Sequence, residues 1–132
     1  AQAINVTPRA QKTSKYVANY CVFNNAAGGA SPVNADCAAF AAGATNWTIS
    51  VTMLATAGNV IPTNLDGLVF NLSPNVRDPA SGNFAVPVAA SRGAIDWACT
   101  SATAIAAQGR ALGNRTVNAT PVPAKYMPAE CR

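Results

Sequence analysis

The sequence predicts one mainly β domain, an antiparallel sheet of about four strands followed by a disulfide-closed, loop-rich C-terminal region. The length of 132 residues fits a single compact domain. Apolar and polar residues alternate with a period of two in several short segments, which is the pattern of strands. Four cysteines, an even number with no Cys-x-x-Cys spacing, favour disulfides over a zinc site. We expect an N-terminal loop over 1–14, strands and loops over 15–99, and a disulfide-bounded region over 99–131.

The clearest strand patterns lie in residues 46–56, 67–73 and 94–99. In each segment apolar side chains fall on one face and polar side chains on the other, as in a strand with one buried face. These segments therefore predict a single apolar sheet face on which a helix of another polypeptide packs, because the chain offers no long amphipathic helix of its own. This face consists of Trp47, Ile49, Val51, Met53, Leu68, Phe70, Leu72, Ile95 and Trp97.

Other segments give weaker signals. Residues 15–23 are rich in β-formers but alternate less regularly, and Pro87 confines 83–88 to an edge strand or a loop. The Pro- and Gly-containing segment 73–82 predicts a loop. One short helix is expected over 101–112, after which the chain runs extended to its end.

The cysteines indicate an oxidising, extracytoplasmic location. Four cysteines allow three pairings, and we favour Cys21–Cys37 with Cys99–Cys131 because each bond then closes a local loop. Each closure contributes roughly 3–4 kcal/mol by loop-entropy arithmetic.

Composition argues against an enzyme. The chain has no His, so it lacks Ser-His and Cys-His relays and His-ligated zinc, and we expect no cofactor, haem or metal. Its five acidic residues are spread without paired spacing. The net charge of +4 comes from scattered basic residues, which allows weak contacts with DNA or another anionic surface but predicts no dedicated groove.

The C-terminal block resembles that of type IV pilins. That family ends in a Trp-x-Cys strand, a variable loop and a Lys-Tyr-Leu-Pro-like stretch before a closing cysteine. In this sequence the residues that match the pattern are Trp97, Cys99, Lys125, Tyr126, Met127, Pro128 and Cys131. Met127 stands where Leu is commoner in the family. The segments Ser14–Val17, Trp47–Met53 and Leu68–Pro74 resemble the family's first three head strands.

The resemblance implies a structural role, the head subunit of an extracellular pilus exported through the periplasm. Type IV pilins begin with a long apolar helix, which this sequence lacks because residues 1–14 are polar and contain Pro8. The helix is therefore expected from a separate chain, as in split pilins, or was removed; the first option is favoured. The expected partners are further copies of the chain, a short apolar helical chain, and host-surface or anionic contacts. The role of the fibre, whether adhesion, motility, DNA uptake or electron transport, stays open.

Two further expectations concern the surface. Among the Asn-x-Ser/Thr motifs, Asn114 is the best placed to carry a surface sugar. The segment from Thr100 to Ala124 is expected to face solvent, since it lacks periodic apolar residues. The alternative to a filament subunit is a small secreted β-sandwich binding module or adhesin that acts without polymerising.

Overall fold

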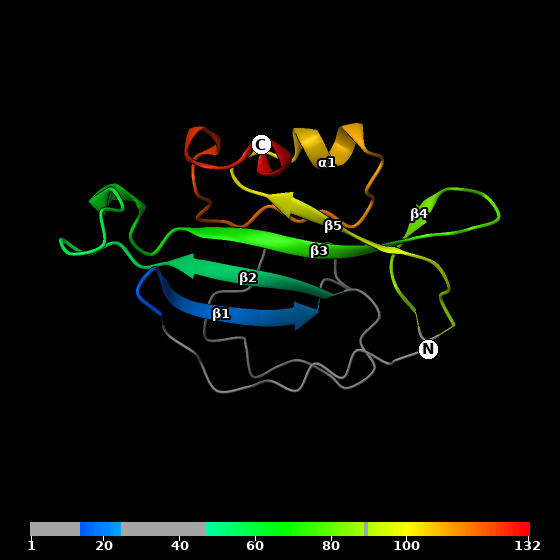
Figure 1. The fold of residues 1–132 in the computed structure, drawn as a ribbon, viewed down its shortest axis with the longest axis horizontal. Helices are drawn as coiled ribbons and strands as arrows, with labels where there is room; N and C mark the ends of the chain where they lie inside the picture. The colour runs from blue at the N-terminus through cyan, green and yellow to red at the C-terminus, as the bar shows by residue number, and fades with distance from the viewer. Residues whose placement is uncertain (1–13, 25–46, 89) are drawn as a thin grey trace.

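The computed structural model describes residues 14–24, 47–88 and 90–132. Their main feature is one antiparallel sheet (Figure 1). Strand β2 lies between β1 and β3, and β5 pairs with the other edge of β3, while the short β4 pairs with the end of β3. The strands are β1 (Val17–Asn24), β2 (Trp47–Met53), β3 (Val69–Arg77), β4 (Phe84–Ala85) and β5 (Ile95–Thr100). The mainly antiparallel fold predicted from the alternation is thus confirmed, with a fifth, very short strand added.

Strand β3 extends farther than the sequence predicts. It continues through Pro74 to Arg77, into the segment expected to be a loop. Pro74 lies beyond the last pair with β2, Ile49–Leu72, so β5 is the one described strand beside it. A proline, which lacks an N–H, is tolerated where a strand is paired on one side. The continued pairing with β5 then holds this half of β3 extended.

The helix is shorter than predicted. Helix α1 covers Ile105–Gly109, because Ser101 does not cap it. The Ser101 hydroxyl instead donates to the carbonyl oxygen of Cys131 at 2.6 Å. The described residues also contain short 3-10 turns: η2 (Thr63–Leu65), η3 (Ala124–Tyr126) and η4 (Ala129–Cys131). None of the helices in the described ranges has the length and apolar content needed to cross a membrane.

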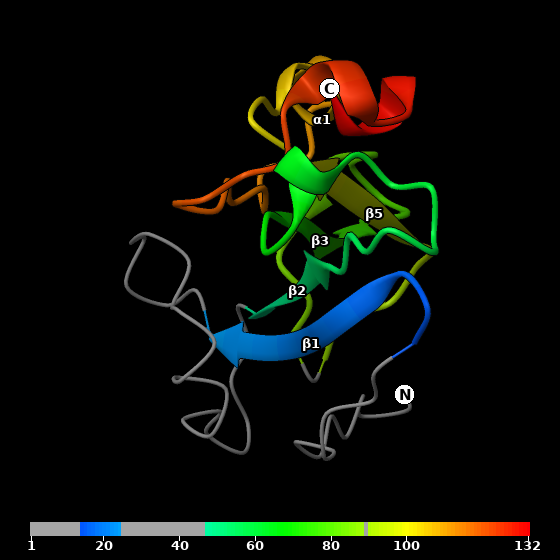
Figure 2. The same cartoon turned by 90° about the vertical axis from the view of Figure 1, so that its left-hand side faces the viewer.

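Helix α1 and η4 lie together along β5, at one edge of the sheet (Figures 1 and 2). Ala98 of β5 packs against Ala107 of α1 and Leu112, with Phe84 beside them. This small apolar cluster attaches the C-terminal region to the sheet.

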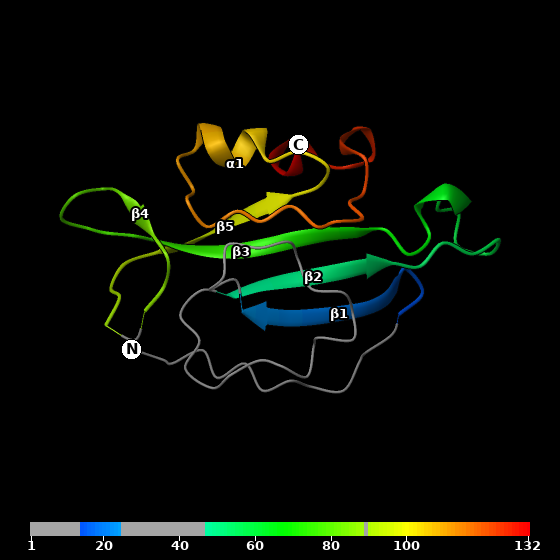
Figure 3. The same cartoon turned by 180° about the vertical axis from the view of Figure 1, so that it is seen from behind.

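The polar face of the sheet is more deeply buried than the apolar face, which the sequence pattern did not predict. On β2 the polar residues Thr48, Ser50 and Thr52 are 0%, 3% and 5% exposed. Their apolar neighbours Ile49 and Val51 are half-buried. The polar side chains of β2 bond to those of β3, and β3 in turn bonds to the main chain of the C-terminal segment. Residues 112–122 of that segment run beside β5 and β3 (orange in Figure 3).

Candidate functional site

The polar face is joined across strands by side-chain hydrogen bonds. Thr48 on β2 bonds Ser73 on β3 at 2.8 Å, and Ser50 donates to the Oδ1 of Asn71 at 2.7 Å. Buried polar groups are tolerated when they are hydrogen-bonded. We call this set the polar platform: Thr48, Ser50, Asn71, Ser73, Asn75 and Thr100.

The platform holds the C-terminal segment by its main chain. The Nδ2 of Asn71 donates to the carbonyl oxygen of Thr116 at 2.7 Å, and the Thr100 hydroxyl donates to the same oxygen at 2.5 Å. Asn75 donates to the carbonyl oxygen of Asn114 at 3.0 Å and accepts from its N–H at 2.9 Å. These four bonds are made to the tail's main chain, so they hold the segment through its backbone.

Asn114 is not the exposed sugar acceptor expected from the sequence. It is 5% exposed, and its Nδ2 donates to the carbonyl oxygen of Pro74 at 2.9 Å. The expectation of a solvent-facing segment from Thr100 to Ala124 was likewise wrong in part. Thr100, Leu112 and Val122 are each at most 1% exposed.

The sequence did carry a signal for the platform. A solvated strand face usually includes Lys or Glu, but alternate positions 48, 50 and 52, and 71, 73 and 75, hold uncharged Thr, Ser and Asn throughout. Short hydrogen-bonding side chains without charge on two neighbouring strands indicate a face that pairs with backbone.

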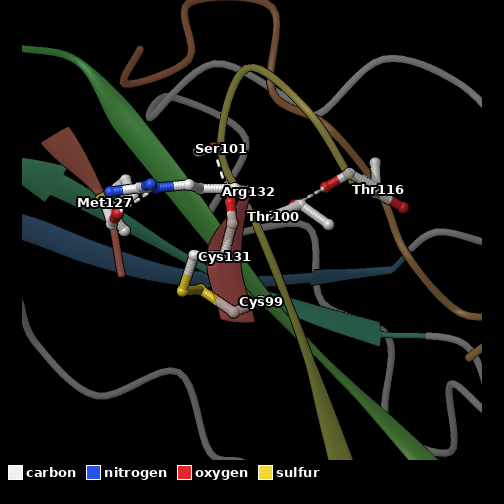
Figure 4. The surroundings of a disulfide bond; sticks show 7 residues. All are labelled: Cys99, Thr100, Ser101, Thr116, Met127, Cys131 and Arg132. Carbon is white, nitrogen blue, oxygen red and sulfur yellow. Dashed lines mark hydrogen bonds between the residues drawn. A yellow bond between two sulfur atoms is a disulfide. The ribbon is translucent and has the colours of Figure 1, made fainter. Parts of the chain in front are cut away.

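The disulfide Cys99–Cys131, expected from the cysteine spacing and the family pattern, is confirmed. It joins the end of β5 to η4 (Figure 4). Nearby, the Nε of Arg132 donates to the carbonyl oxygen of Met127 at 2.8 Å, so the final residues are fixed on both sides of Cys131. The other expected pair, Cys21–Cys37, lies outside the residues whose side chains the structure describes.

The Lys-Tyr-Met-Pro stretch forms η3 and the link to η4. The ammonium of Lys125 lies 4.9 Å from the ring centroid of Tyr126. A hydrogen bond from the Asn64 side chain, and to a smaller extent Lys125, lowers the pKa of the Tyr126 hydroxyl. Asn64 belongs to η2, in the β2–β3 loop. Met127 and Pro128 then lead into η4.

The opposite, apolar face is incompletely covered. The register places Val51 and Phe70 opposite one another, and Ile49 opposite Leu72, at its centre. Ile95 and Trp97 on β5 are 44% and 38% exposed. The other members with described side chains are half-buried: Ile49, Val51, Met53, Leu68, Phe70 and Leu72. Trp47 is the first residue of β2.

No group of three or more Cys, Asp or Glu side chains in the described ranges is arranged to hold a metal ion. Half-buried Asp96 forms an ion pair with exposed Arg110. Asp78 bonds the backbone N–H of Ala80 and the Ser81 hydroxyl, which lowers its pKa. These carboxylates are bound within their own loops and surfaces rather than gathered in a cleft.

Comparison with known proteins agrees with this architecture. The family described as pilin, a bacterial filament protein, matches residues 3–132. The chain belongs to the pilin family. Among solved structures, a type IV pilin of Pseudomonas aeruginosa is similar, with 26% identity and a TM-score of 0.56. The match covers 92% of this chain and 67% of that pilin. No curated protein matches the sequence.

The family defines the general role of this pilin. Pilins are structural subunits of filaments, and membership implies assembly into a homo-oligomeric pilus outside the cell, at its surface. The resemblance noted at Trp97, Cys99 and the Lys-Tyr-Met-Pro stretch is thereby confirmed at the level of the family.

Proposed function

We propose that this pilin is the head subunit of a type IV pilus and that it coats a core of apolar helices. The helix that each head covers comes from a separate chain or from a segment ahead of residue 1 of a longer protein. The subunit would reach the surface by export through the periplasm.

The observation that carries this proposal is the apolar face of the sheet. Six of its side chains are half-buried and two more are over a third exposed. Completing the burial of a large aliphatic or aromatic side chain contributes about 1.5–3 kcal/mol relative to full exposure. A helix with an apolar stripe packs on such a face, because helix-on-sheet layers are a standard way of burying it.

The two faces have different roles in this proposal. The polar platform is occupied by the chain's own tail, so it supports the outward-facing C-terminal region. The apolar face is then the side directed toward the filament axis. Host-surface or DNA contacts, if the fibre makes them, would fall on the tail side.

A central charge on the apolar face tests the proposal. Val51→Lys should leave a folded subunit, judged by circular dichroism and a cooperative melt, but block its incorporation into filaments. The matched control is Gln108→Lys, at an exposed position of α1 on the other side of the sheet's edge from this face. Normal filaments from Val51→Lys would contradict a helix-covered face.

The source of the helix is tested by intact mass. Filaments whose heads have the 13.4 kDa mass of this sequence, together with a second short apolar chain, would establish a split pilin. A single heavier species would assign the helix to the same polypeptide.

A further inference from the structure

The loop between β2 and β3 has near its middle a valine, Val60, that projects into solvent in a strained backbone conformation. Val60 is 93% exposed and has a φ of 57°. A β-branched residue rarely adopts this left-handed conformation, in which Gly or Asn is favoured. In the isolated subunit the Val60 side chain is therefore not buried, and its backbone conformation is unfavourable. Residues held in strained conformations often lie at functional sites.

The loop is built to hold this valine outward. The neighbouring Asn59 is 1% exposed, and its Nδ2 donates to the carbonyl oxygens of Lys15 at 2.7 Å and Leu54 at 2.6 Å. Its Oδ1 accepts from the N–H groups of Thr56 at 3.0 Å and Ile61 at 3.3 Å. Four hydrogen bonds to one buried side chain fix the residues on both sides of Val60, so its projection is preset rather than fluctuating.

A second apolar feature lies toward the other end of the molecule. Residues 86–88, Val-Pro-Val, follow β4; Val88 is 49% exposed and the other two are half-buried. In Figure 1 the β2–β3 loop lies at one end of the long axis, and the segment after β4 lies toward the opposite end, which the β3–β4 loop forms. Neither Val60 nor Val88 belongs to the apolar face of the sheet, on which the proposed helix packs.

We propose that Val60 of one subunit packs on residues 86–88 of a second copy of this chain in the filament. Pilins assemble as homo-oligomers, so every copy carries both ends of the contact. Two different surfaces, one toward each end of the molecule, make a heterologous contact, which repeats along an open filament instead of closing into a dimer. The contact adds to the helix-mediated assembly of the proposed function and rests on it.

A variant that relieves the backbone strain at Val60 distinguishes a role in filament contacts from a role in folding. Val60→Asn should keep or raise the melting temperature of the isolated subunit, because Asn tolerates a positive φ. The same variant should lose subunits from filaments faster, on the order of tenfold, because one apolar anchor is removed. The control is Ile105→Asn, since Ile105 is 71% exposed on α1 but lies outside both ends of the contact.

Cysteine cross-linking tests the pairing itself. In assembled filaments, Val60→Cys with Val88→Cys should give a ladder of covalent multimers on treatment with a short bismaleimide, whereas each single variant should not. A 60–60 cross-link in the single variant, an absent ladder in the double variant, or unchanged filament stability in Val60→Asn would overturn the proposal. If wild-type subunits form no filaments, the proposed function fails instead.

Discussion

Replacing Asn75 by Ala tests whether the polar platform holds the C-terminal segment. The Asn75 side chain is fully buried and makes two hydrogen bonds with the main chain of Asn114. The substitution removes both bonds and leaves a buried N–H and a buried C=O without this partner. Each lost bond costs about 1 kcal/mol, and an unsatisfied buried group raises the penalty toward 1–3 kcal/mol. We expect a loss of about 2–4 kcal/mol in the free energy of unfolding.

Such a loss is large beside the roughly 5–15 kcal/mol of a typical domain. It corresponds to a fall in melting temperature of about 6–16 °C for a chain of this size. Urea denaturation of the non-reduced protein measures this loss in the free energy of unfolding. The matched control is Asn83→Ala, an exposed position in the β3–β4 loop, which should change stability by about 0.5 kcal/mol or less. Equal effects of the two substitutions would refute the platform.

Three further outcomes follow from the described contacts. Removing the Cys99–Cys131 disulfide, whose cysteines are 32 residues apart, with an Ala pair should cost about 3–4 kcal/mol in denaturant unfolding. Gly93→Ala should lower the free energy of unfolding by about 3 kcal/mol or more, because φ is +124° and the new Cβ would lie 2.1 Å from the carbonyl oxygen of Arg77 in β3. Gly109→Ala, with open space around the new Cβ, should raise it by up to about 1 kcal/mol. Asn64→Ala should raise the pKa of Tyr126 toward its ordinary value in an ultraviolet titration, since the lost hydrogen bond is the largest cause of the lowered value. The bond favours tyrosinate. Its contribution to stability is therefore present above the unfolded-state pKa of Tyr126 and is lost as pH falls through the folded-state pKa.

Period-two alternation was enough to place the strands. Residues 46–56, 67–73 and 94–99 each contain most of a strand, because backbone geometry alone sends successive side chains to opposite faces. The Trp-x-Cys and closing-cysteine pattern likewise led to the correct disulfide.

The alternation could not tell which face would be covered. Thr48 bonds Ser73 on the neighbouring strand. Asn71 bonds Ser50 and also the carbonyl oxygen of Thr116, 45 residues later in the sequence. A hydropathy pattern assigns such polar residues to solvent, because it does not include the hydrogen-bond partners that allow them to be buried. For the same reason Asn114 was taken as a surface residue, although both its backbone and its side chain bind the sheet.

Short-range signals also failed where distant contacts compete. Ser101 has the character of a helix cap, but its hydroxyl bonds Cys131, so α1 begins only at Ile105. Pro74 suggested a loop, but pairing with β5 keeps β3 extended through it.

The measurement that tests the central claim most directly is a density map of the assembled filament by electron microscopy. Our account predicts a helix lying across the face that contains Val51, Phe70 and Leu72, with the polar platform and its tail directed outward. A map in which that face is open to solvent, or in which the platform faces the filament axis, would contradict it.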